Sequence, residues 1–301
     1  YDFNFRKNCN ICNISNLYYN KVKFRRIEGM KKFLVVILAL FFALSAQTVF
    51  AAQTKTTKKK KTYTEREFSV QTRDGHLIRS YLSYPKTKMK GYPTIIMLHA
   101  LGYNSSYWIS LQKKYNARGY AVLRIDLRGH GKSVYDKSFH QRSWRNFKNK
   151  DFEQYPNDVI QTIQFIEKQT KKPSFVNYAL VGSDIGANTA VIVARKMKIK
   201  PRALILLAPS MEFKGLYIPV VLTEIGKTPI LALASKTDKY YMDQQIRIAR
   251  FAQGTFDVAN AESGNSGMLI LKQHPEFQNA IVSWTEQYFK NAKAKPSTKK
   301  K

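Results

Sequence analysis

Between Glu65 and Phe289, short apolar runs alternate with longer segments whose apolar residues recur every three or four positions. Two stretches of alternating apolar and polar residues enclose Arg73-Asp74-Gly75, where the Asp-Gly step predicts a tight hairpin. The predicted strands cover 67–71, 76–84, 94–98, 120–125, 179–181, 203–207, 229–234 and 256–259, and the predicted helices cover 106–118, 159–166, 185–195, 242–252 and 275–289. Strands that alternate with helices predict a mostly parallel, eight-stranded sheet with helices on both faces.

The segment before this pattern is organised as a leader. Met30 is followed by two lysines, an apolar run at 33–44 and small residues up to position 51. This order is typical of a secretory signal peptide, and the run is too short for a membrane span. We therefore expect an untranslated upstream segment at 1–29, a signal peptide at 30–51, and a mature chain without a transmembrane span. Such a protein would be exported, either to a periplasm or out of the cell.

The net charge of +31 is concentrated outside the predicted domain. Lysine-rich segments at 52–64 and 290–301 flank the domain at 65–289, and their composition predicts disorder. Two interpretations are open: solubilising tails, or adhesion to an anionic envelope polymer. Lysine runs without interleaved aromatic residues do not predict specific nucleic-acid binding. Both cysteines, Cys9 and Cys12, lie in the upstream segment, and no cofactor is expected.

The pattern Gly182-Ser183-Asp184-Ile185-Gly186 lies between an apolar run and a segment of helical periodicity. It predicts a strand, a sharp turn and a helix, with glycines on either side where side chains would collide with strand or helix. This geometry would lift the side chain of Asp184 above the sheet edge, at the positive end of the helix. From that position we expect an ionised carboxylate.

Three motifs in sequence order resemble those of the α/β-hydrolase superfamily, in its compact branch of dienelactone hydrolases and monoacylglycerol lipases without a cap domain. They are HALG at 99–102, DLRGHGKS at 126–133 and GSDIGANTA at 182–190. The resemblance implies an oxyanion hole formed by the backbone N–H groups of Leu101 and Ile185, and a monomer acting on a small acyl substrate.

The catalytic triad implied by the resemblance is altered. Asp184 occupies the nucleophile-elbow position, where most relatives have serine, and Asp238 matches the triad acid. Ser266 stands where the triad histidine is expected, before Gly267. A serine nucleophile needs an imidazole to take its proton, and an aspartate nucleophile needs one to activate the water that releases the product.

Three functions follow from this altered triad. The first is a pseudoenzyme that binds a ligand in the envelope or at the cell surface. The second is a hydrolase of small esters that uses Asp184 with His99 or His274 as a substitute base. The third is a cation site formed by Asp184 and Asp238. The loop at 210–227 would either roof an acyl pocket or complete the core.

Overall fold

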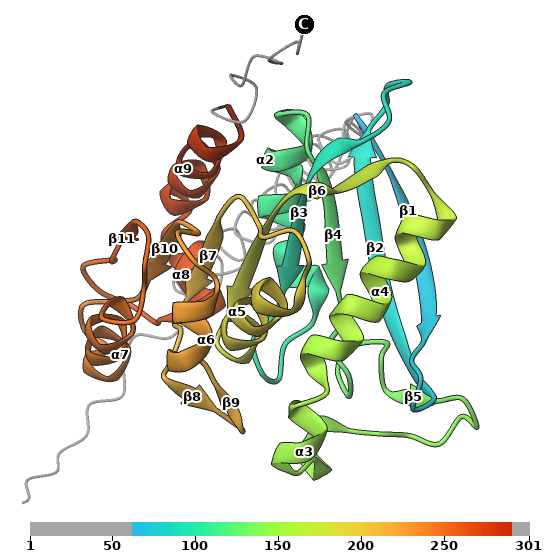
Figure 1. The fold of residues 1–301 in the computed structure, drawn as a ribbon, viewed down its shortest axis with the longest axis horizontal. Coiled ribbons are helices and arrows are strands. Elements are labelled where there is room, and N and C mark those ends of the chain that lie inside the picture. Colours follow the sequence, from blue (N-terminus) through green and yellow to red (C-terminus); the bar gives the residue numbers. More distant parts are fainter. Residues whose placement is uncertain (1–61, 291–301) are drawn as a thin grey trace, which may run out of the picture. The chain divides into compact units, whose positions relative to one another are not determined.

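The computed structural model describes residues 62–290, and the predictions made for 1–61 and 291–301 lie outside this range. Its main sheet follows the order β1-β2-β4-β3-β6-β7-β10-β11, with the two-residue strand β5 paired to β2 (Figure 1). The strands β1 and β2 are antiparallel to their neighbours, and the pairs from β4 to β11 are parallel. The predicted eight-stranded, mostly parallel sheet is confirmed, with β5 as an addition.

The strands are β1 Tyr63–Gln71, β2 His76–Pro85, β3 Tyr92–Leu98, β4 Ala121–Ile125, β5 Tyr135–Asp136, β6 Pro173–Ser183, β7 Leu204–Leu207, β10 Ile230–Leu233 and β11 Phe256–Val258, with a separate hairpin of β8 Glu212–Phe213 and β9 Leu216–Tyr217. The helices are α2 Ile109–Ala117, α3 Asn149–Phe152, α4 Tyr155–Gln169, α5 Ile185–Lys196, α6 Pro219–Glu224, α7 Lys239–Ala249, α8 Ile270–Gln273 and α9 Glu276–Lys290, with 3-10 turns η1 Ser105–Trp108, η2 Trp144–Asn146 and η3 Gly267–Leu269.

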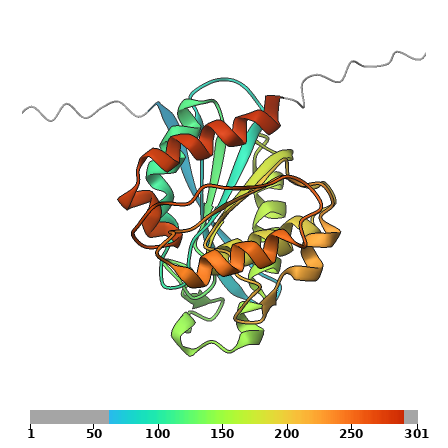
Figure 2. The same ribbon diagram turned by 90° about the vertical axis from the view of Figure 1, so that its left-hand side faces the viewer.

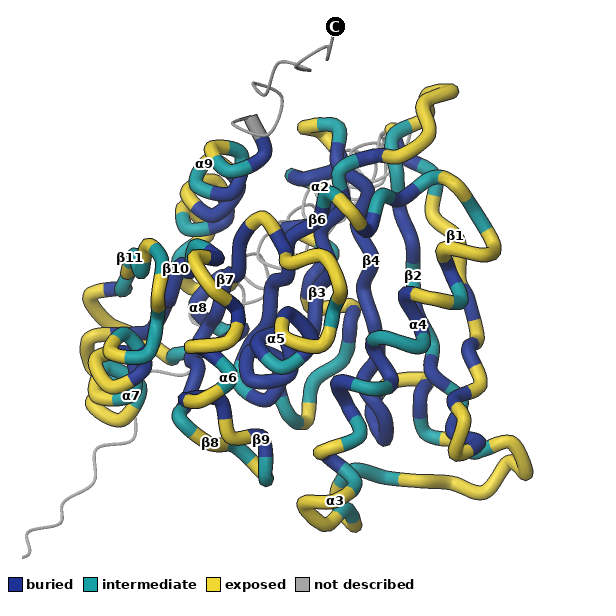
Figure 3. Tube along the Cα trace, viewed as in Figure 1, coloured by how far each residue is buried: buried dark blue, intermediate teal, exposed yellow. Residues whose placement is uncertain are grey.

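Two apolar clusters fill the two faces of the sheet. Helices α4 and α5 contact each other on one face, and α2 and α9 contact each other on the opposite face. Figure 2 looks onto the β11 edge, where α7 and α9 lie nearest the viewer. The central strands are continuously buried (Figure 3), as apolar runs covered on both sides require.

The chain order reverses at β3, which pairs with β4 on one side and with β6 on the other. Leu98 at the end of β3 lies opposite Gly182 near the end of β6. The loops that leave these two strands therefore diverge from neighbouring points at the carboxyl edge of the sheet. Such a point is where open α/β sheets bind ligands, and both Leu101 and Asp184 lie there.

The segment at 210–227 forms β8, β9 and α6 and mainly completes the core. Leu216 and Ile218 are buried in the cluster beneath α5, whereas Tyr217 is exposed. No separate cap domain is evident within residues 62–290. In the same range, no helix has the length and apolar character needed to cross a membrane.

Candidate active site

The turn between β6 and α5 holds Asp184 in a strained backbone conformation. Its φ of 56° and ψ of −121° lie in a region that side chains other than glycine rarely adopt. A Cβ at Gly182 would lie 2.2 Å from the Gly186 carbonyl oxygen, and a Cβ at Gly186 would lie 2.4 Å from the Leu98 carbonyl oxygen. Both flanking glycines are therefore required by the close approach of helix and strand.

The carboxyl of Asp184 is turned into a largely dry environment. Burial raises its pKa to about 7, while hydrogen bonding to the backbone N–H groups of Ile185 and Leu101 acts in the opposite direction. The Oδ1 atom has no hydrogen-bond partner in the described part of the chain. Burial therefore opposes the ionised form that the helix start favours, because the loss of hydration outweighs the N–H groups there.

Two side chains hold the loop after β3 against the elbow. The Gly102 N–H donates to Nε2 of His130 (3.0 Å), and the Ala100 N–H points to the sulfur of Met268 (3.3 Å). The intervening Leu101 is therefore fixed on both sides. Its N–H acts on the same carboxyl as that of Ile185, which is the relation expected of two oxyanion-hole donors.

His99 is buried and has both ring nitrogens engaged. Nδ1–H donates to the Ala100 carbonyl (2.8 Å), and Nε2 accepts from the Leu127 N–H (2.9 Å). Burial lowers its pKa to about 4. An imidazole in this state neither reaches nor takes a proton at the elbow, so His99 is structural.

Both ring nitrogens of His274 also have partners other than Asp184. Its Nε2 lies 2.9 Å from the Ser263 carbonyl, and its Nδ1 lies 3.3 Å from Oε1 of Glu276. The other three histidines bind backbone carbonyls or a partly buried carboxylate: His76 the Ser133 carbonyl, His130 the Arg128 carbonyl, and His140 the side chain of Asp136. All five histidines of the sequence are thus placed, and none has a contact with Asp184.

Ser266 lies beside the elbow and the loop after β10. Its Oγ accepts a hydrogen bond from the Ser235 N–H (3.0 Å). Gly267 has a φ of 72°, and a Cβ there would lie 3.2 Å from Oγ of Ser183. The structure therefore places Ser266 and Gly267 against the elbow, where the family resemblance implies the triad histidine and its following glycine. A hydroxyl group stands there in place of an imidazole.

Asp238 begins α7 and caps it. Its Oδ1 accepts from the Tyr241 N–H (3.3 Å), and its own N–H donates to the Ser235 carbonyl (3.0 Å). No hydrogen bond joins Asp238 to Ser266 or Asp184 within residues 62–290. The carboxylate therefore acts here as an N-cap.

Replacing Asp238 by alanine is expected to lower the free energy of unfolding by about 1 kcal/mol, the usual cost of a lost N-cap. Asp238→Asn keeps a capping oxygen and should change stability by only a few tenths of that. Urea unfolding of both variants measures the difference. Equal losses in the two variants would show that the carboxylate charge, rather than the cap, stabilises this loop.

Tyr241 is a site residue that the sequence analysis missed. Burial raises the pKa of its phenol, and the nearby carboxylates of Asp184 and Asp238 add to this effect. Tyr241 therefore lies close to both acids, on the first turn of α7. A signal was present in the sequence, since a helix that starts directly after Asp238 directs its first turn toward the carboxyl edge of the sheet.

The acidic residues here do not form a metal site of familiar composition. Among residues 62–290, no group of three or more His, Cys, Asp or Glu side chains is arranged to hold a metal ion. What remains is a largely buried carboxyl of raised pKa beside two backbone donors and a phenol.

The sheet order, the strained turn after β6 and the paired N–H groups define an α/β-hydrolase fold. The family model described as serine aminopeptidase, S33, matches residues 91–252, which include the elbow and Asp238 and end before Ser266. The chain belongs to this family of α/β-hydrolases. No curated protein matches the sequence.

Solved structures share the fold at low sequence identity. An acetyl xylan esterase from Paenibacillus sp. R4 superposes with a TM-score of 0.61 at 16% identity, covering 77% of this chain and 86% of the esterase. Est1E from Butyrivibrio proteoclasticus, with bound ferulic acid, gives 0.59 at 14% identity, with 76% and 100% covered. A dienelactone hydrolase from Klebsiella pneumoniae gives 0.58 at 12% identity, with 76% and 100% covered.

Proposed function

We propose that this α/β-hydrolase is a pseudoenzyme, which binds a small acyl compound at the elbow without sustained turnover. The observation that carries the proposal is that all five histidine side chains are hydrogen-bonded or ion-paired to groups other than Asp184. If Asp184 formed a covalent ester, no neighbouring imidazole would activate the water that releases the product. A carboxyl with a pKa of about 7 is, in addition, partly protonated at neutral pH and then is no nucleophile.

A second candidate, an ester hydrolase that uses Asp184, is favoured by one specific observation. The costly conformation at Asp184 persists together with both N–H groups of the oxyanion hole. Strain of this kind is often retained where it serves chemistry. The solved structures that share the fold include esterases. This candidate depends on a histidine base, which the described residues do not place at the elbow.

The proposed setting is the cell envelope. The signal-peptide pattern at 30–51 and the lysine-rich segments at 52–64 and 290–301 support export and contact with an anionic polymer. Contact through the basic segments would keep the protein near the surface while the elbow holds its acyl ligand.

The experiment compares ester turnover by the full mature chain with that of Asp184→Ala. A series of p-nitrophenyl esters from acetate to octanoate is supplied, and product release is followed over the uncatalysed rate. We expect equal, background rates for both proteins. Turnover by the unaltered chain that Asp184→Ala abolishes would instead establish the hydrolase.

A further inference from the structure

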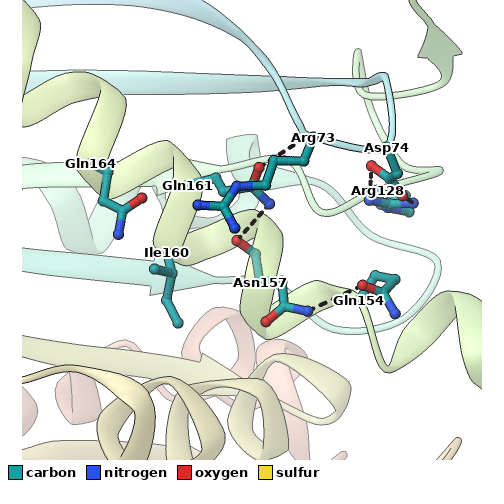
Figure 4. A pocket seen from close by; sticks show the side chains of 8 residues that line it. All are labelled: Arg73, Asp74, Arg128, Gln154, Asn157, Ile160, Gln161 and Gln164. Carbon is teal, nitrogen blue, oxygen red and sulfur yellow. Dashed lines mark hydrogen bonds and ion pairs between the residues drawn. The ribbon is translucent and has the colours of Figure 1, made fainter.

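A polar cavity of about 330 Å³ lies between the β1–β2 hairpin and α4, away from the elbow. Its lining includes Arg73 and Asp74 at the hairpin tip, Arg128 at the floor, and side-chain amides of α4 (Figure 4). This volume is at the lower end of the range of ligand pockets, roughly 300–1,000 Å³. The cavity, called here the α4 cavity, shares no lining residue with the candidate active site.

The floor of the α4 cavity is a satisfied ion-pair network. Arg128 is nine-tenths buried and donates to both oxygens of Asp158 (2.8 and 2.6 Å) and to both oxygens of Asp74 (2.5 and 2.9 Å). These four hydrogen bonds leave the guanidinium a single free N–H, on Nη1, so it cannot offer a bidentate pair of donors to a ligand. The exposed carboxylate of Asp74 also disfavours an anion at this floor.

Arg73 supplies the cavity with an unoccupied guanidinium. Its backbone N–H donates to Oε1 of Gln161 (2.8 Å), which anchors the hairpin tip to α4, and no described residue pairs with its side chain. Figure 4 shows this side chain extending over α4. Together with Asp74, Arg128 and Asp158, it brings the local charge close to balance, with two cations and two anions.

The wall of the cavity is a row of amides. Gln154, Asn157, Gln161 and Gln164 follow one another at spacings of three or four residues along one face of α4. The Asn157 amide donates to Gln154 (3.1 Å) and accepts from Lys196 (2.8 Å), and the Gln161 amide accepts from the Arg73 N–H and donates to the Asn157 carbonyl. The Gln164 amide has no partner among the described residues. An amide both donates and accepts, as a hydroxyl group does.

We propose that the α4 cavity binds a neutral sugar of one or two pyranose units. Charge balance argues against a simple anion, and the free Gln164 amide with the Arg73 guanidinium matches the mixed donors and acceptors of adjacent hydroxyl groups. Ile160, which also lines the cavity, offers an apolar surface to the C–H face of a ring. This proposal is independent of the elbow and of whether the protein turns over esters.

The test is saturation-transfer NMR on the full chain with methyl glucoside, methyl galactoside, maltose and inorganic phosphate as separate probes. At least one sugar is expected to bind saturably. Arg73→Ala should weaken that binding at least about tenfold, the effect of losing hydrogen bonds to a charged group. Because the anchor of Arg73 to Gln161 is its backbone N–H, the substitution leaves the hairpin attached.

Gln164→Ala provides a second variant should Arg73→Ala unfold, and it should also weaken sugar binding. The matched controls are Arg250→Ala, at the exposed end of α7, and Gln169→Ala, which lies on another side of α4. Both should bind as the unaltered chain does. The proposal fails if no sugar binds, if sugar binding survives both cavity variants, or if phosphate binds through Arg73 while sugars do not.

Discussion

A double variant with Asp184→Ser and Ser266→His is expected to hydrolyse p-nitrophenyl acetate at least about 10²-fold faster than either single variant, the lower range of a general base's contribution. The elbow, its strain and the Leu101 and Ile185 donors are already in place. The step at 266–267 already lies against the elbow. The two substitutions would therefore add a hydroxyl and an imidazole to a frame that already holds the turn and the two oxyanion donors.

The matched control places the same imidazole elsewhere on that loop. Asp184→Ser with Ser263→His should remain at the level of Asp184→Ser alone, since Ser263 is exposed and contacts His274 rather than the elbow. Initial rates at saturating ester measure the comparison. If the double variant folds and is no faster than its control, the loop does not hold the triad position that we assign to it.

Asp184→Asn is expected to stabilise the protein at pH 8 and to leave its stability nearly unchanged at pH 4. Burial raises the pKa of Asp184 from 3.8 to about 7. Between these values the folded chain keeps a proton that the unfolded chain has lost, so the free energy of unfolding falls as pH rises through this window. The gain at pH 8 is on the order of 4 kcal/mol as an upper limit.

Urea unfolding of the variant and the unaltered chain at both pH values measures this gain, because other titrating groups cancel in the difference. Asp243→Asn, at an exposed position paired with Arg247, is the control and should show no comparable gain at pH 8. A stabilisation by Asp184→Asn that is the same at pH 4 and pH 8 would contradict a buried, proton-binding carboxyl.

The fold could be predicted from the sequence because its signals are local. Three kinds of signal depend only on a few neighbouring residues: the apolar runs, the Asp-Gly turn and the glycines around Asp184. All three are consistent with the same arrangement of strands and helices. The predicted start of α7 at 242 is wrong: the helix begins at Lys239, because Asp238 caps it. The motif comparison matched Asp238 to the triad acid, and its role as the N-cap of a helix was therefore missed.

The state of the candidate site could not be predicted in the same way. The pKa of Asp184 depends on how much water the packed loops exclude, and the roles of the histidines depend on partners far apart in sequence. Nothing near His99 in the sequence indicates the Leu127 N–H that occupies its Nε2. Tyr241 differs in this respect, since the start of α7 directly after Asp238 indicates its place in the sequence, whereas its closeness to Asp184 comes from the packing of α7.

The central claim is that an elbow carboxyl stands without an imidazole. An NMR titration that follows the Asp184 carboxyl carbon together with the five imidazoles, in the unaltered chain and in Asp184→Asn, tests it most directly. We expect the carboxyl to titrate near a pKa of about 7 and every imidazole midpoint to be the same in both proteins. A histidine whose pKa drops in Asp184→Asn, beside a carboxyl that stays ionised in acid, would reveal a working pair and contradict the account.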